Sequence, residues 1–357
     1  MKIFSFGGVQ SERDYRDIPL RAVQSPVAIP RTFINDISAI PVLNQRKIGA
    51  CVGHAWTCAK MWMEYKETKA ILPFSARFVY ALAKEQDGFP GEGTFYRLGG
   101  KVLNQKGCAL EGTLANDTTL THEEYIKTSA IHQNAYKEAK PYSIKGYAAV
   151  DISSKEAVKQ AIVQNGVLPF GVRLGKEWWN DKKGNASWQA SDILPVRPPE
   201  TVISGHAIAV YGYETLPDGD LMLYFRNSWS DQWASKGNGK FKWSEYSPYF
   251  VEAWAYVDLP NDWKEHIEQP PKNAFRYSFL VNMKYGDGKN KPNKEVKALQ
   301  TALKILGFFP ANVSETGYYG LITQMAVMKF LNSKDIMESG QYAGPKTRAI
   351  LNSIFAS

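Results

Sequence analysis

Cysteine is scarce in this sequence, with 3 residues among 357. So few thiols exclude the disulfide framework that stabilises many small secreted domains. No run of about 20 apolar residues is present, which excludes a membrane-spanning helix. The opening residues, MKIFSFGGVQ, lack the apolar segment of about 7 to 15 residues that is typical of a signal peptide. With 44% hydrophobic residues, the chain can instead bury one large core and one small one.

Three short stretches carry most of the chemical information: NQRKIGACVGHAW at 44–56, GHAIAVYGY at 205–213 and FRNSW at 225–229. A cysteine thiol, with a pKa of about 8.5, needs a nearby cation or a helix N-terminus to become a nucleophile at pH 7. Cys51 opens a run with apolar residues at helical spacing, so the helix dipole would favour its thiolate. His206 precedes one predicted strand and Asn227 closes another. The histidine can supply an imidazolium, and the asparagine can hold it in one tautomer.

On these residues the chain resembles the papain-like cysteine peptidases, over roughly residues 29–260. Gln45 lies six residues before Cys51, which is the family's spacing between its oxyanion glutamine and its nucleophile. The resemblance implies that Cys51 attacks the scissile carbonyl, that His206 moves the proton and that Asn227 orients His206. The Gln45 side chain and the Cys51 backbone N–H would then hold the oxyanion.

The resemblance implies two further roles at the cleft. Trp229, in the Asn-Ser-Trp motif, would shield the hydrogen bond between His206 and Asn227 from water. The stretch GEGTFYRLGGKVLNQKGCALE looks like the family's substrate-cleft loop and helix, and the backbone of Gly93 would pair with the substrate.

Other readings of the same residues are less favoured. His54 lies on the same predicted helix as Cys51, so its imidazole is poorly placed to approach across a cleft, and we interpret it as a packing histidine. Cys51, His54 and Cys58 share a helical face, but paired spacings such as C-x₂-C are absent, so we expect no metal site and no cofactor. Cys58 and Cys108 could pair in a disulfide or stay as isolated buried thiols.

The chain departs from the family in two ways. Only about 28 residues precede the catalytic domain, in place of a long inhibitory prosegment. Either the enzyme is made active, or this short arm or a partner blocks the cleft. Ser230 stands where the family usually has a glycine after the tryptophan, which could alter the geometry of that loop.

A second module follows residues 263–291, whose Pro-Pro pair, Gly-Asp-Gly and lysines are typical of a linker. Three helical patterns come next, in EVKALQTALKILG, TQMAVMKFL and PKTRAILNSIF. Their order, with the Thr-Gly-Tyr-Tyr-Gly turn and Gly-Pro-Lys-Thr-Arg, resembles the peptidoglycan-binding family of three-helix modules. Residues 264–357 hold 13 Lys and Arg against 7 Asp and Glu, so +6 of the net +8 lies there. Such charge favours anionic wall polymers, and no nucleic-acid-reading motif accompanies it.

We therefore predict an α+β chain with a two-lobed papain-like fold, a helical lobe at roughly 45–140 and a β-barrel-like lobe at roughly 145–260, followed by a small all-α module. The predicted boundaries are an N-terminal extension 1–28, a peptidase domain 29–262, a linker 263–291 and a wall-binding domain 292–357. The predicted function is a cysteine endopeptidase held near the bacterial cell wall, with protein or peptide substrates and a cell-wall polymer as partners. The alternatives are a hydrolase of peptidoglycan stems or crossbridges and a catalytically idle wall-binding scaffold. The module favours an extracellular or wall-associated location, although no signal peptide is visible.

Overall fold

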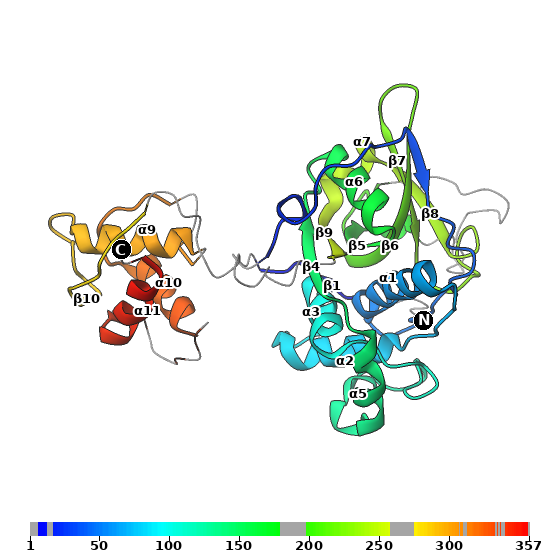
Figure 1. Ribbon diagram of the computed structural model, residues 1–357, viewed down its shortest axis with the longest axis horizontal. Helices are drawn as coiled ribbons and strands as arrows, with labels where there is room; N and C mark the ends of the chain where they lie inside the picture. The colour runs from blue at the N-terminus through cyan, green and yellow to red at the C-terminus, as the bar shows by residue number, and fades with distance from the viewer. Residues whose placement is uncertain are drawn as a thin grey trace. The chain divides into compact units, whose positions relative to one another are not determined.

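The computed structural model (Figure 1) describes residues 6–12, 17–178, 198–257, 275–306, 308–309, 313–332, 334, 336 and 340–355. The chain divides into two compact units. The first holds residues 1–12 and 18–259, and the second holds 13–17 and 260–357. Residues 263–274 of the predicted linker lie outside the described residues. The predicted domain boundaries stay a prediction.

The first half of unit 1 is mainly helical. Its longest helix, α1, is buried at every residue from Cys51 to Trp62, which is typical of a helix at the centre of a core. Helix α2 is capped at its start by the Ser75 side chain, which accepts a hydrogen bond from the Phe78 N–H, and it ends at Gly88 in the left-handed conformation. The helices of this part are α1 (Cys51–Thr68), α2 (Ala76–Asp87), α3 (Tyr96–Lys106), α4 (His122–Ile126) and α5 (Gln133–Ala139).

The second half of unit 1 is an antiparallel sheet. Its strands lie in the order β4-β9-β5-β6-β7-β8, and β2 pairs with β6. The strands are β2 (Thr32–Ile34), β4 (Gly146–Val150), β5 (Leu168–Leu174), β6 (Ser204–Thr215), β7 (Leu221–Arg226), β8 (Asn238–Lys242) and β9 (Phe250–Val257). Helices α6 (Lys155–Asn165) and α7 (Trp243–Tyr246) connect them. Two short strands, β1 (Gly8–Val9) and β3 (Thr94–Phe95), form a separate pair.

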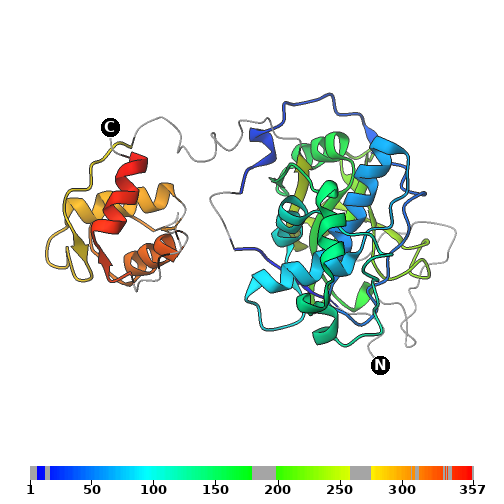
Figure 2. The same ribbon diagram turned by 60° about the horizontal axis from the view of Figure 1, so that its bottom comes forward.

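Helix α1 packs against the sheet. One hydrophobic core contains Trp56 of α1, Phe78 of α2, Ala209 of β6 and Trp254 of β9. Figures 1 and 2 show α1 running beside the sheet. Helix α2 packs against α1, and α3 contacts α1, α2 and the strands β4 and β9. Because the start of α1 and the start of β6 meet at this junction, residues far apart in the sequence come together there. The predicted arrangement of a helical lobe against a β lobe is confirmed.

Unit 2 contains the three predicted helices, α9 (Lys294–Ile305), α10 (Leu321–Asn332) and α11 (Pro345–Phe355), and a short ribbon of β10 (Met283–Lys284) and β11 (Tyr342–Ala343). Phe279 and Met283, from the segment predicted as a linker, are buried in its core. Gln300 is buried in α9 and holds the Thr-Gly-Tyr-Tyr-Gly turn, since its Oε1 accepts the Gly317 N–H and its Nε2 donates to the Tyr318 carbonyl.

The described residues give three further findings. Cys51, Cys58 and Cys108 are all free and buried, so the pairing left open for Cys58 and Cys108 is not formed. Within the described ranges no group of three His, Cys, Asp or Glu side chains is placed to bind a metal ion. In the same ranges we find no helix with the length and apolar character that a membrane crossing needs.

Candidate active site

The sulfur of Cys51 lies at the N-terminus of α1. Cys51 is the first residue of that helix and is fully buried. The preceding loop is tightly hydrogen-bonded: the Ile48 N–H donates to the Gln45 carbonyl at 3.0 Å, and the Gly49 N–H donates to the Glu92 carboxylate at 2.9 Å. This loop fixes the thiol where the dipole of the helix favours a negative charge.

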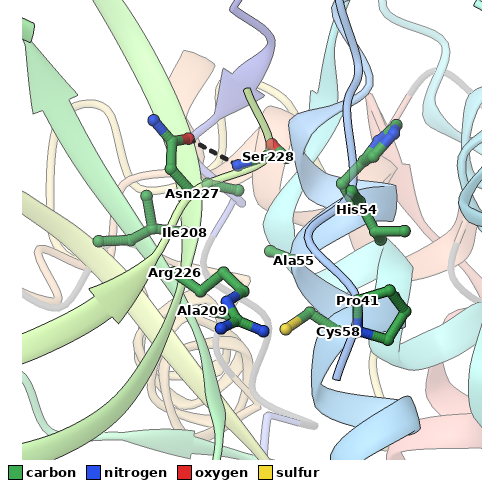
Figure 3. Close-up of a pocket in the computed structure, with 11 residues that line it drawn as sticks. Pro41, His54, Ala55, Cys58, Ile208, Ala209, Arg226, Asn227 and Ser228 are labelled. Carbon is green, nitrogen blue, oxygen red and sulfur yellow. Dashed lines mark hydrogen bonds between the residues drawn. The ribbon is translucent and has the colours of Figure 1, made fainter. Parts of the chain in front are cut away.

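His206, near the start of β6, is hydrogen-bonded to Asn227, which follows β7. The atoms Nε2 of His206 and Oδ1 of Asn227 are 2.8 Å apart. The same Oδ1 accepts the backbone N–H of Ser228 at 2.8 Å (Figure 3), so it is the amide oxygen that faces His206. Nε2 must therefore carry the proton, which leaves the lone pair of the neutral ring on Nδ1. The Nδ1 atom has no hydrogen-bond partner among the described residues.

The backbone places His206 beside Cys51. The N–H of Ala207, the next residue after His206, points at the Cys51 sulfur and lowers the pKa of the thiol. The predicted nucleophile and the predicted base, 155 positions apart in the sequence, thus meet where α1 packs against β6. The structure brings Cys51, His206 and Asn227 into one cluster.

Aromatic side chains surround the His206 ring. The Trp229 ring centroid lies 4.9 Å from it, and that of Trp178 lies 5.9 Å away at an interplanar angle of 81°. Phe6, from the N-terminal segment, approaches edge-on at 6.4 Å. Trp229 is therefore in contact with the His206 ring, and its role as a shield over the hydrogen bond between His206 and Asn227 stays a prediction.

Gln45 is joined to the segment that follows Asn227. Its Oε1 accepts the Ser228 hydroxyl at 2.6 Å, its backbone N–H donates to the Ser228 carbonyl at 2.9 Å, and its Nε2 donates to the Ile48 carbonyl at 3.0 Å. The side chain is fully buried in the loop that leads into Cys51. Ser230, close by, has a φ of +67°, a left-handed conformation that glycine adopts with least strain.

The N-terminal segment, residues 6–12, lies over this cluster, and we call it the arm. Strand β1 of the arm pairs in parallel with β3, and the Thr94 N–H donates to the Gly7 carbonyl at 2.8 Å. The N–H of Gly7 points at the Cys51 sulfur. Gly93 has a φ of +98°, and its own N–H donates to the Tyr80 hydroxyl at 2.8 Å. The edge predicted to pair with a substrate is therefore occupied by the arm, and Thr94 supplies the hydrogen bond.

The arm continues into a second anchor beyond β1. The Ser11 hydroxyl and N–H both donate to the Glu252 carboxylate, at 2.7 Å and 3.0 Å. The Arg97 guanidinium donates to the Glu12 carbonyl at 3.2 Å. The arm is thus attached at two places, at Gly7 beside Cys51 and at Ser11 and Glu12.

Burial decides the charge state of the cluster in this arrangement. Burial raises the pKa of the Cys51 thiol to about 12, although neighbouring backbone N–H groups lower it. Burial also lowers the pKa of His206 to about 4, against the opposing effect of the Asn227 hydrogen bond. The expected thiolate and imidazolium are therefore not the favoured forms while the arm covers them, because neither charge is in contact with water.

His54 lies apart from this cluster, as the sequence suggested. Its Nδ1 donates to the Ala50 carbonyl at 2.8 Å, and its Nε2 accepts from the Asn116 amide at 3.2 Å. The Asn116 Oδ1 in turn accepts the Tyr125 hydroxyl. Figure 3 shows the His54 ring turned away from Asn227. Burial lowers its pKa to about 4, so we interpret it as a neutral packing histidine.

The two buried histidines predict a loss of stability in acid. Both have folded-state pKa values near 4 against an ordinary value of 6.5. Between those pH values the unfolded chain takes up protons that the folded chain does not, so the free energy of unfolding should fall as the pH falls, by on the order of 3 kcal/mol per histidine. Urea unfolding followed by tryptophan fluorescence measures this mainly in unit 1, because nine of the 10 tryptophans lie before residue 260.

The control for this acid effect is His54→Gln. It should reduce the pH dependence by about half, because one of the two titrating rings is removed. An equal slope in the variant and the wild type would mean that the histidines are not its source.

Below the cluster, Arg226 fixes the end of β7. Its guanidinium donates to the carbonyls of Ile37 and Ile40 and to the Asn238 Oδ1. Figure 3 shows this group facing the Cys58 sulfur across a cavity of about 10 Å³, which has room for one water molecule. Because Arg226 directly precedes Asn227, these hydrogen bonds hold the asparagine in position.

Several residues of the site were not found from the sequence. Phe6, Gly7 and Gly8 lie in the arm, and nothing in their local pattern indicates where the arm would fold back. Trp178 lies in GKEWWND, and this local sequence does not indicate which residues the side chain contacts. Tyr96 lies in the predicted cleft helix, and its hydroxyl donates to the His206 carbonyl at 3.2 Å.

Comparisons with known proteins match the chain to two family models. Residues 40–251 match the family model described as papain family cysteine protease, and residues 292–351 match a model described as a peptidoglycan binding domain. No protein among the curated ones matches the chain.

Solved structures with the same fold are cysteine proteases and related proteins. Xylellain, a cysteine protease from Xylella fastidiosa, has a TM-score of 0.60 at 20% identity, over 72% of this chain and 97% of that one. A structure from work on the mite allergens Blo t 1 and Der p 1 has a TM-score of 0.50 at 15% identity, over 68% of this chain and 74% of that one. At these identities the likeness establishes the fold.

Proposed function

This chain belongs to the papain family of cysteine proteases, and we propose that it is an endopeptidase whose triad is Cys51, His206 and Asn227. The observation that carries the assignment is the 2.8 Å contact between Nε2 of His206 and Oδ1 of Asn227. It leaves Nδ1 as the basic nitrogen of a ring whose next residue, Ala207, directs its N–H at the Cys51 sulfur, and a base in a fixed tautomer close to a thiol is what nucleophilic catalysis needs.

The proposed reaction has two halves. His206 takes the thiol proton while the Cys51 sulfur attacks the scissile carbonyl, and it then gives that proton to the leaving amine as the thioester forms. A water molecule next attacks the thioester, loses a proton to His206 and releases the acid, after which the thiol regains its proton. Asn227 keeps the ring oriented in both halves, and Trp229 keeps water away from their hydrogen bond.

The oxyanion would be held by two donors, the Gln45 side chain and the Cys51 backbone N–H. Gln45 is positioned for this by its hydrogen bonds to Ser228 and Ile48. One such donor stabilises a transition state by about 3 kcal/mol in comparable enzymes. The edge at Gly93 and Thr94 would pair with the substrate backbone once the arm has left.

The test of this function is cleavage of an unfolded protein by the full chain before and after alkylation with iodoacetamide. Loss of cleavage in proportion to the Cys51 adduct, located by peptide mass, supports the assignment. Cleavage that persists after complete modification of Cys51 rules out the thiol as nucleophile.

Unit 2 would bring the enzyme to the cell wall. The support for this is its match to a peptidoglycan binding domain and its net charge of +6 over residues 264–357. The partners would be protein or peptide substrates and an anionic wall polymer, and the protein would then act outside the cell or at its wall.

We expect the full chain carrying Cys51→Ala to sediment with purified sacculi at moderate salt, and a chain with the same substitution that ends at residue 263 to stay in the supernatant. The inactivated nucleophile prevents digestion of the sacculi during the measurement. Equal sedimentation of the two proteins would remove the wall-targeting role from unit 2 and leave the peptidase assignment intact.

A second candidate function is cleavage of peptidoglycan stems or crossbridges, which the match of unit 2 to a peptidoglycan binding domain favours. The two functions differ in their substrate. New amino termini released from sacculi, without cleavage of unfolded proteins, would select the wall hydrolase. Cleavage of unfolded proteins, without new amino termini released from sacculi, would select the general endopeptidase.

A further inference from the structure

The arm shows how an extended peptide backbone fits over Cys51. Gly7 and Gly8 lie between β3 and the start of β6, and the Gly7 N–H points at the sulfur while its carbonyl is held by Thr94. The carbonyl of Gly7 is therefore hydrogen-bonded away from the oxyanion donors.

Neither glycine has room for a side chain. A Cβ on Gly7 would lie 1.9 Å from the Gly49 carbonyl oxygen, and a Cβ on Gly8 would lie 2.1 Å from the Tyr96 hydroxyl. Neither residue has a left-handed φ, so an L-residue could adopt the backbone conformation. Glycine is required at both positions because neighbouring atoms of the cleft leave no space for a Cβ.

The atoms that exclude a side chain are different at the two glycines. Gly7 faces main-chain atoms, since the Gly93 Cα would also lie 2.7 Å from its added Cβ. Gly8 faces one side chain, that of Tyr96. The ring of Tyr96 cannot easily move, because it is buried and a Cβ on Gly171, on the sheet, would lie 2.7 Å from its Cζ. Its hydroxyl is also held by the His206 carbonyl.

We infer that the cleft selects peptides with two consecutive glycines, and that Tyr96 is the residue that excludes a side chain at the second of these positions. The inference rests on the proposed peptidase function for its biological meaning. Its physical content, which is the exclusion of a Cβ by Gly49 and by Tyr96, can be tested without any hydrolysis. The arm itself serves as the bound peptide in that test.

The binding experiment measures the rate at which iodoacetamide modifies Cys51 in the full chain. Gly8→Ala should displace the arm and raise this rate about tenfold or more, and Gly7→Ala should do the same. Adding Tyr96→Leu should return the Gly8→Ala rate to near the wild-type value, because the ring atoms nearest the new methyl group are gone. The same addition should not rescue Gly7→Ala, whose obstacle is the Gly49 backbone.

Gly112→Ala is the matched control, because a Cβ there meets no atom within 4 Å, and its modification rate should equal that of the wild type. Tryptophan-fluorescence melting of every variant separates arm displacement from unfolding. A wild-type rate for Gly8→Ala, or equal rescue of both variants by Tyr96→Leu, would overturn the selectivity.

The second experiment uses full-length Gly7→Ala enzyme, with its cleft open, and three peptides that differ only in Gly-Gly, Ala-Gly or Gly-Ala at the centre. We expect kcat/KM for Gly-Gly to exceed the others by about tenfold or more, and Tyr96→Leu to improve the Gly-Ala peptide alone. Equal cleavage of all three would refute the selectivity. Cleavage of none, with the alkylation pattern as expected, would refute the peptidase function and leave the selectivity as a property of binding.

Discussion

Cys51→Ala is expected to lower hydrolysis of an unfolded protein substrate by about 10⁴-fold or more, because the covalent route is lost as a whole when its nucleophile is removed. The fold should survive, since the substitution deletes one buried sulfur and leaves the hydrogen bond between His206 and Asn227 untouched. Steady-state cleavage by the full chain, together with a melting curve, measures both effects. Activity close to that of the wild type would mean that Cys51 is a buried packing residue and that another group is the nucleophile.

His54→Ala is the companion to this substitution. The imidazole of His54 bonds to Ala50 and Asn116 and faces away from Asn227, so its loss should lower stability while the folded protein keeps most of its activity. Leaving the Asn116 amide without its acceptor should cost about 1–3 kcal/mol in the free energy of unfolding. If both variants lost activity equally, His206 could not be assigned as the base.

The core of the site could be predicted because its residues carry their own local signals. Cys51 follows a tight loop and opens a helix, His206 starts a strand and Asn227 ends one. Each of these positions is fixed by hydrophobic periodicity over a short window. Their meeting point depends on how α1 packs against β6, which the family resemblance supplied and residue spacing alone could not.

The rest of the site depends on long-range contacts that the local sequence does not indicate. Gly7 and Gly8 look like any pair of loop glycines, and their role appears only where Gly49 and Tyr96 approach them. The pKa values of Cys51 and His206 likewise follow from burial beneath the arm, a property of the folded chain. A thiolate was expected from the helix dipole, but desolvation opposes it and is the larger effect here.

In unit 2 the helices could be predicted and the beginning of its core could not. The periodicity of α9 and α11 is clear in the sequence, whereas Phe279 and Met283 stand among lysines, glycines and prolines that favour a linker. The Phe279 backbone is hydrogen-bonded to the Asn352 side chain of α11, and Met283 is buried where β10 pairs with β11. That pairing joins positions about 60 residues apart, beyond the reach of any short pattern.

Removal of residues 1–9 is expected to activate the enzyme. Without the arm, Cys51 and His206 regain contact with water, so the pKa of the thiol should fall and that of the imidazole should rise, which favours the ion pair needed for attack. Both alkylation and cleavage are limited by the fraction of molecules whose cleft is open. Because the arm covers the cleft in most molecules, its removal should increase each rate about tenfold or more. Iodoacetamide labelling of Cys51 and peptide hydrolysis measure the two rates on the same protein.

A free peptide with the sequence FSFGGVQS provides the reciprocal control. Added to the shortened enzyme, it should slow the labelling of Cys51, whereas the same residues with the two glycines replaced by alanine should have little effect. A free peptide loses more entropy on binding than the tethered arm does. Its effect should therefore require millimolar concentrations. Labelling and hydrolysis at wild-type rates in the shortened enzyme would mean that the arm does not close the cleft in solution, and the low reactivity of Cys51 would then need another cause.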